Sequence, residues 1–215
     1  MTSVQVPADR IQRWVENFQG RHGTTALSVL DGCLEGSASD GSTFAASLPL
    51  GERYAGLPDP SAFAGAAREA LPGDWGVLLV RKGGFAVARL SRARTVDSKV
   101  GKRHVQGRTK AGGQSQQRFA RRRANQARAA FEAAAEHAAR ILDGLPGPLV
   151  TGGDRTAVAD VLGDHRLARL ADLVVGPWLS VPDPRRDVLE QAVRDASSVT
   201  VEVVNSESGA WPDRA

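Results

Sequence analysis

The sequence has little cysteine, few aromatic residues and no long apolar run. Its one cysteine, Cys33, excludes an internal disulfide and a zinc site built on several cysteines. Aromatic residues make up only 5% of the chain, and none form the stacking platform that sequence-specific RNA-binding proteins use. No segment approaches the length of a membrane span, and the N-terminus has no apolar signal core. We therefore expect a soluble, cytoplasmic protein that contacts no membrane.

Histidine is also sparse, and acidic residues are missing from one long stretch. The four histidines are scattered without metal-ligand spacing, so we expect neither a metal site nor a cofactor. Residues 99–128 contain no Asp or Glu but ten cations. These are Lys99, Lys102, Arg103, Arg108, Lys110, Arg118, Arg121, Arg122, Arg123 and Arg128. Because the net charge of the chain is only +4, this concentration favours a directed polyanionic partner over a solvated basic helix face.

The first hundred residues contain alternating helix and strand signals. Residues 8–19 and 61–71 predict amphipathic helices, and residues 24–30 predict a strand. The stretch 31–57 is rich in Gly, Ser and Pro, which indicates short strands joined by loops. Residues 75–81 and 85–91 predict a hairpin that turns at residues 82–84, and residues 94–105 predict a third strand beside it.

The second half predicts a long helix followed by alternating elements. Residues 118–143 carry a seam of small and apolar residues at steps of four and three, namely Ala120, Ala124, Ala127, Phe131, Ala134, Ala138 and Ile141. Strands at 148–151, 173–175 and 199–204 then alternate with helices at 156–162 and 187–196, which is typical of a partly parallel sheet. We expect one α/β domain over residues 1–204, a mixed sheet flanked by helices, and a polar tail at 205–215.

Between the third strand and the long helix lies the tripeptide Gly112-Gly113-Gln114. A chain of this composition contains such a tripeptide by chance roughly 0.1 times, so the motif is weak alone. Its context is more specific, because it forms the tip of the acid-free basic segment. Two glycines permit backbone conformations closed to other residues and allow close approach to a substrate.

The run QGRTKAGGQSQQRFARRR at residues 106–123 resembles the catalytic loop and following helix of the Vms-like release factors. These peptidyl-tRNA hydrolases are related to the catalytic domain of eukaryotic and archaeal release factors, and the resemblance is specific over residues 106–128. It implies a fold like that catalytic domain, with a basic glycine-glycine-glutamine loop that leads into a long helix. It also implies hydrolysis of the ester between nascent chain and tRNA on stalled or split ribosomes.

The resemblance further implies which residues act and on what. Gly112, Gly113 and Gln114 would be catalytic, and the ten cations would contact large-subunit rRNA and the acceptor end of peptidyl-tRNA. We expect a monomer. In the family the glutamine stands five positions after the lysine, whereas Gln114 stands four after Lys110 and Gln116 stands six after it. Gln116 is therefore an alternative catalytic residue.

Three other interpretations remain open. A non-catalytic ribosome- or RNA-binding module would dock through the same basic loop and helix. A nuclease would need clustered metal-binding carboxylates, and the basic region has none. Residues 151–155 follow a strand and could cradle a phosphate, but a plain turn with Asp154 or Thr156 as the helix cap is favoured. His104, near the tip, is a proton carrier or an exposed strand histidine.

Overall fold

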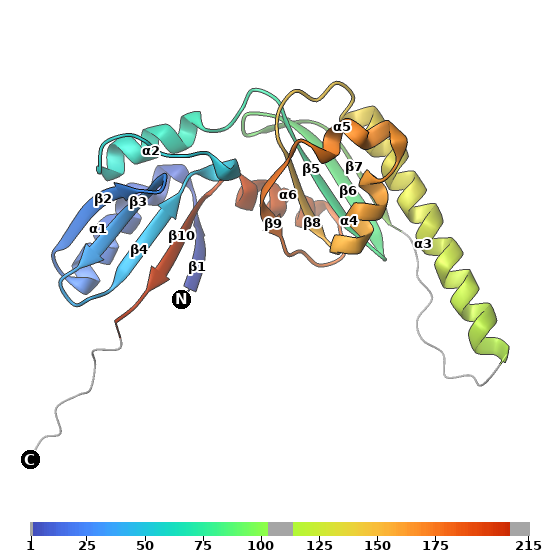
Figure 1. Cartoon of the computed structure of the whole chain (residues 1–215), viewed down its shortest axis with the longest axis horizontal. Helices are drawn as coiled ribbons and strands as arrows, with labels where there is room; N and C mark the ends of the chain where they lie inside the picture. The colour runs from blue at the N-terminus through green and yellow to red at the C-terminus, as the bar shows by residue number, and fades with distance from the viewer. Residues whose placement is uncertain (1, 103–113, 207–215) are drawn as a thin grey trace, which may run out of the picture. The chain divides into compact units, whose positions relative to one another are not determined.

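A computed structural model describes residues 2–102 and 114–206 of the chain (Figure 1). Residues 102 and 114–127 are described as parts of their strand or helix. The chain divides into two compact units, the first comprising residues 1–71 and 197–215 and the second residues 72–196. Each unit contains its own five-stranded sheet.

The first unit is an antiparallel sheet with the strand order β1-β10-β4-β3-β2. Its strands are β1 (Thr2–Val6), β2 (Thr25–Leu30), β3 (Cys33–Ala38), β4 (Thr43–Ser47) and β10 (Val199–Val204), and its helices are α1 (Ile11–His22) and α2 (Pro60–Glu69). Both helices pack into one apolar cluster that contains Val15, Phe63 and the strand residues Leu34 and Phe44. The helices therefore cover one face of the sheet, and the outward side chains form an open face.

The second unit is a mixed sheet with the order β7-β6-β5-β8-β9. Its strands are β5 (Trp75–Arg81), β6 (Gly84–Ser91), β7 (Arg94–Lys102), β8 (Leu149–Gly153) and β9 (Val174–Leu179). Its helices are α3 (Gln114–Ile141), α4 (Arg155–Leu162), α5 (Ala168–Ala171) and α6 (Arg186–Ala196). Strands β5, β8 and β9 run parallel, whereas β6 and β7 are antiparallel to their neighbours.

The central strand β5 shows why this sheet has helices on both sides. Its residues Val77, Leu78, Leu79 and Val80 are consecutive and all almost fully buried, as expected of a strand covered on both faces. Leu78 and Val80 lie in the cluster formed with α3 and α4. Helix α6 contacts β5 and β6 and, by alternation along the strand, covers the opposite face.

The structure confirms the α/β class with a mixed sheet flanked by helices, and places β5 and β10 at the predicted residues. The expected alternation of strands and helices is confirmed, but its last strand, β10, lies outside the partly parallel sheet and pairs antiparallel with β1 and β4 in the first unit. The physical reason is visible in β10, where buried Val199 and Val201 alternate with more exposed Thr200 and Glu202. Such alternation suits a half-covered antiparallel sheet.

Two further elements differ from expectation. Strand β1 was not predicted, since its five residues contain only two apolar side chains and pair as an edge strand. Helix α3 begins at Gln114 rather than 118 and ends at Ile141. Residues 103–105 of the predicted third strand lie outside the described residues, as does the tail from 207. The expectation that residues 1–204 act as one catalytic domain stays a prediction.

Candidate functional site

The predicted catalytic loop joins two described elements of the second unit. Its residues Arg103, Arg108, Lys110, Gly112 and Gly113 lie outside the described residues. The segment before it ends at Lys102, the last residue of β7, and the segment after it begins at Gln114, the first residue of α3. The contacts of these two elements therefore determine how the predicted loop is attached to the second unit.

The end of β7 is held by an aromatic ring across the strand pair. Gly101 pairs with Phe85 of β6, and a Cβ atom on Gly101 would lie 2.2 Å from the Phe85 ring. On α3, His137 stacks on the same ring with centroids 5.6 Å apart and planes 26° apart. The ring thus covers the glycine and joins the end of β7 to α3. The sequence analysis did not predict this contact between Gly101, Phe85 and His137. The signal in the sequence was a glycine within one predicted strand and a phenylalanine in the strand beside it.

The C-terminal half of α3 is anchored on the sheet by alanines. Ala130, Ala134, Ala135 and Ala138 are buried with Ile141, and the small side chains let the helix approach β6 closely. Ala134, Ala138 and Ile141 of the predicted seam are confirmed as buried, and Phe131 is half-buried. The side chains of Ala120, Ala124 and Ala127 lie outside the described part. The helix has 28 residues and is about 42 Å long, so it runs on past the edge of its sheet (Figure 1).

Both candidate glutamines, Gln114 and Gln116, belong to the first turn of α3. Their side chains lie outside the described part of the chain.

The start of α3 has the electrostatics of an anion site. The first four backbone N–H groups of a helix have no partner within the helix, and its dipole is positive at this end. No acidic residue lies in the first turn of α3 to compete for these donors. The backbone N–H of Gln114 is one of the four. A helix start of this kind can stabilise a developing oxyanion.

One described cation of the site, Lys99, lines a hollow between β7 and α3. Lys99 on β7 and Arg128 on α3 are both exposed. The hollow has a volume of about 360 Å³ and is lined by Gly84, Phe85, Lys99, Gly101, Ala129, Ala130, Ala133 and His137. The structure thus places Lys99 and the Gly101-Phe85-His137 stack together. Arg118, Arg121, Arg122 and Arg123 belong to α3, but their side chains lie outside the described part.

The turn at residues 151–155 is a helix cap. The Asp154 carboxylate accepts a hydrogen bond of 3.1 Å from the backbone N–H of Ala157. A carboxylate already occupies the start of α4, so the structure confirms the plain turn over the phosphate cradle.

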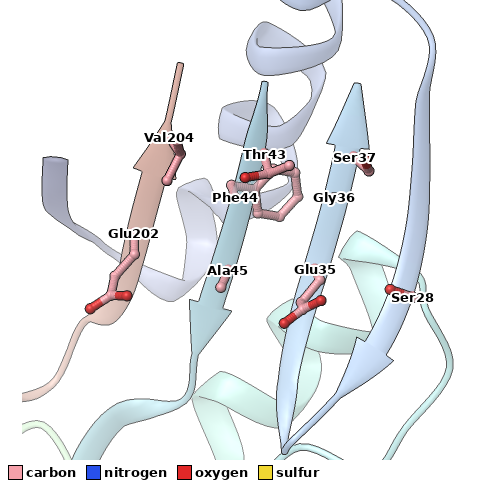
Figure 2. Close-up of a pocket in the computed structure, with 9 residues that line it drawn as sticks. All are labelled: Ser28, Glu35, Gly36, Ser37, Thr43, Phe44, Ala45, Glu202 and Val204. Carbon is pink, nitrogen blue, oxygen red and sulfur yellow. The ribbon is translucent and has the colours of Figure 1, made fainter. Parts of the chain in front are cut away.

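A second hollow, in the first unit, has the opposite electrostatic character. Figure 2 shows Glu35 and Glu202 on either side of Ala45 on the open face of the sheet. Three hydroxyl residues, Ser28, Ser37 and Thr43, are among the remaining lining residues, and no lysine or arginine takes part. This acidic, hydroxyl-rich face does not suit a polyanion, so the candidate RNA site belongs to the second unit.

Neither a metal centre nor a membrane helix is found in the described part of the chain. Across residues 2–102 and 114–206, no group of three or more His, Cys, Asp and Glu residues could hold a metal ion. In the same residues no helix is long and apolar enough to cross a membrane.

Comparison with known proteins gives a family match and distant similarities to solved structures. A family model described as "Actinobacteria/chloroflexi VLRF1 release factor" matches residues 73–202. The crystal structure of an archaeal translation termination factor, aRF1, is 15% identical and covers 74% of this chain and 48% of its own, with a TM-score of 0.43. A structure described only as an archaeal protein is 12% identical and covers 73% and 48%, with a TM-score of 0.37. The chain spans about half the length of both, and no curated protein matches it.

Proposed function

The chain belongs to the VLRF1 release factors of Actinobacteria and Chloroflexi, and from that premise we propose that it is a peptidyl-tRNA hydrolase. Its substrate is the ester that joins a nascent chain to the terminal adenosine of tRNA on a stalled or split ribosome. The matched residues 73–202 include the whole basic segment and α3. One observation carries the proposal. The tripeptide Gly112-Gly113-Gln114 lies in an acid-free basic segment, and its glutamine is the first residue of the 28-residue helix α3.

The reaction is a hydrolysis that needs positioning more than acid–base chemistry from the protein. A water oxygen attacks the ester carbonyl carbon, the bond to the ribose 3′-oxygen breaks, and that oxygen leaves with a proton. The products are a free peptide acid and a tRNA with its 3′-hydroxyl restored. No carboxylate occurs in residues 99–128 to act as a general base. Substrate and ribosomal RNA groups therefore complete the site around the loop.

Gln114 has two roles in this proposal. Its backbone N–H, at the positive end of α3, donates to the developing oxyanion or the leaving 3′-oxygen, and one such donor typically lowers the barrier by about 2.7–4 kcal/mol. Its side chain orients the attacking water. Gly112 and Gly113 let the backbone approach the ester. Gln114 is preferred to Gln116 because it completes the glycine-glycine-glutamine tripeptide.

The cations bind phosphates of rRNA and of the tRNA acceptor end. Such contacts supply affinity and register without reading sequence. Lys110 and Arg118 bracket the tripeptide in the sequence and are assigned to the acceptor end. Lys99 lines the hollow between β7 and α3, and Arg128 is exposed on α3. Both extend the contact beyond the loop.

The test is release of the nascent chain from purified stalled ribosome complexes. Wild type, Gln114→Ala and Gln116→Ala are compared with Gln126→Ala, a glutamine farther along α3, as the matched control. Wild type and Gln126→Ala should release the chain, and Gln114→Ala should not, although it still binds. Loss in Gln116→Ala alone would transfer the role to Gln116. Binding without release by wild type would instead favour the docking module.

A further inference from the structure

The carboxyl ends of three parallel strands meet at one edge of the second unit's sheet. Strands β5, β8 and β9 end at Arg81, Gly153 and Leu179. Two hydrogen bonds connect the end of β5 to the segments that follow β8 and β9. The Asp154 N–H donates to the Val80 carbonyl at 2.8 Å, and the Arg81 guanidinium donates to the Val181 carbonyl at 2.7 Å. In open α/β sheets, ligands bind outside the carboxyl ends of the strands.

Arg155 lies at this edge and is held flat against an aromatic ring. Its guanidinium carbon is 4.4 Å from the ring centre of Trp178. Trp178 is half-buried and packs against the core of the unit, whereas Arg155 is exposed. Within the described residues Arg155 forms no ion pair, and the neighbouring Asp154 carboxylate is engaged as the cap of α4. The stack restricts the side chain and leaves the N–H edge of the guanidinium available.

The same edge is where the basic segment leaves the sheet. Lys82 is exposed in the turn between β5 and β6. Lys102, at the end of β7, pairs with Gly84 at the start of β6. The acidic side chain of Asp183 lies next to this turn, 3.5 Å from the Arg81 guanidinium, and offsets its charge. Exposed Lys82 therefore adds positive charge at the same edge of the sheet as Arg155.

We propose that Arg155, backed by Trp178, binds a backbone phosphate of RNA at a second contact point, separate from the loop and from α3. A planar guanidinium forms two parallel hydrogen bonds to phosphate oxygens, which a lysine cannot do. The contact fixes the orientation of the protein on the RNA and reads no sequence. The identity of the RNA as ribosomal or transfer RNA rests on the proposed function.

The test measures binding of the full chain to purified large ribosomal subunits at 50–200 mM salt (about the range over which such contacts weaken most visibly). All variants carry Gln114→Ala, so that affinity is measured whether or not the protein hydrolyses anything. Arg155→Ala should bind roughly 3- to 10-fold more weakly, with a salt slope lower by about 1. Arg155→Lys should recover only part of the affinity, because the charge remains without the bidentate geometry.

The matched control is Arg169→Ala. Arg169 is an exposed arginine of α5, which precedes β9 and so lies toward the opposite edge of the sheet. The Arg169→Ala variant should bind large subunits with the same affinity as the Gln114→Ala parent. All variants should unfold at the same denaturant midpoint. The proposal is overturned if Arg155→Ala binds like the parent, if Arg169→Ala loses as much, or if the parent does not bind. Failure of hydrolysis alone, with binding and the Arg155 effect intact, would remove the proposed function and leave this contact standing.

Discussion

At the scale of single residues, glycines are placed where a neighbouring ring takes the space of a side chain. In both sheets a glycine pairs across strands with a phenylalanine, Gly36 with Phe44 and Gly101 with Phe85. A Cβ on Gly36 would lie 2.1 Å from the Phe44 ring, nearly the same distance as at Gly101. The second pair matters for the proposed function because it holds the end of β7, which precedes the proposed catalytic loop.

The first prediction concerns this pair. Gly101→Ala should lower the free energy of unfolding by about 1–3 kcal/mol, since the buried Phe85 ring must move. Gly20→Ala is the matched control, because Gly20 lies inside α1 with no atom within 4 Å of the added carbon. It should raise stability by roughly 0.5–1 kcal/mol. Urea unfolding of both variants provides the measurement, and the same sign for both would contradict the argument.

The second prediction concerns Asp164 and acid. Hydrogen bonds from the side chain and backbone of Arg166 hold the pKa of Asp164 far below its usual range. Because the folded pKa is lowered, the stabilisation is present above the unfolded value near 4 and is lost as pH falls below it. Asp164→Asn should therefore destabilise the protein at pH 7 and reduce the loss of stability between pH 5 and about 2. Urea midpoints across that range provide the check, and an unchanged pH dependence would contradict it.

At the scale of elements, one arginine joins three segments of the second unit. Arg89 of β6 donates to both carboxylate oxygens of Asp74, at 2.9 and 2.6 Å, and to the carbonyl of Asp143, at 2.7 Å. Asp74 directly precedes β5 and Asp143 follows the end of α3. The C-terminal end of α3 is thus tied to the sheet by a charged fork as well as by its alanine seam.

The third prediction tests this link. Arg89→Lys should cost about 1–2 kcal/mol, since a lysine cannot make the three bonds at once. Arg140→Lys is the control, because the Arg140–Asp97 pair joins α3 to β7, the strand next to β6, on the surface with 59% and 43% of the side chains exposed. It should change stability by less than about 0.5 kcal/mol. If Arg89→Lys and Arg140→Lys lowered the free energy of unfolding equally, the hydrogen bonds of Arg89 would add no more stability than the surface pair, which would contradict the prediction.

Helices and strands could be predicted from the sequence where the local hydrophobic pattern matches the burial of the element in the fold. The apolar run of β5 and the amphipathic pattern of α6 needed no tertiary information, and both lie within one residue of the predicted ranges. The sheet to which β10 belongs could not be read from element order, because β10 returns to pair with β1 across almost the whole length of the chain. Phe85 and His137 were likewise missed, since their stack joins residues that are 52 positions apart.

At the scale of the whole molecule, charge is divided between the two units. The first unit holds 6 cationic and 11 acidic residues, a net charge of −5, and the second holds 22 and 13, a net charge of +9. The overall value of +4 hides this difference. The family match covers the second unit and most of β10, and the open face of the first unit presents Glu35 and Glu202. A polyanionic partner is therefore expected to engage the second unit.

The fourth prediction follows from this division. Lys99→Ala combined with Arg128→Ala should weaken binding to large ribosomal subunits and lower the salt slope by about 2. The rate of release at saturating protein should stay within a few fold, since neither residue is assigned to the reacting ester. Glu35→Gln combined with Glu202→Gln, on the first unit, is the control and should bind like wild type. Equal effects of the two double variants in a salt titration would contradict a directed site.

The most direct test of the central claim is the single-turnover rate of peptide release at saturating protein, where differences in binding no longer contribute. Gln114→Ala should release at least about 100-fold more slowly than wild type, as expected when a positioned group at the transition state is disturbed. Gln116→Ala should stay near the wild-type rate. Equal rates for wild type and Gln114→Ala would contradict the assignment of Gln114 as the catalytic residue.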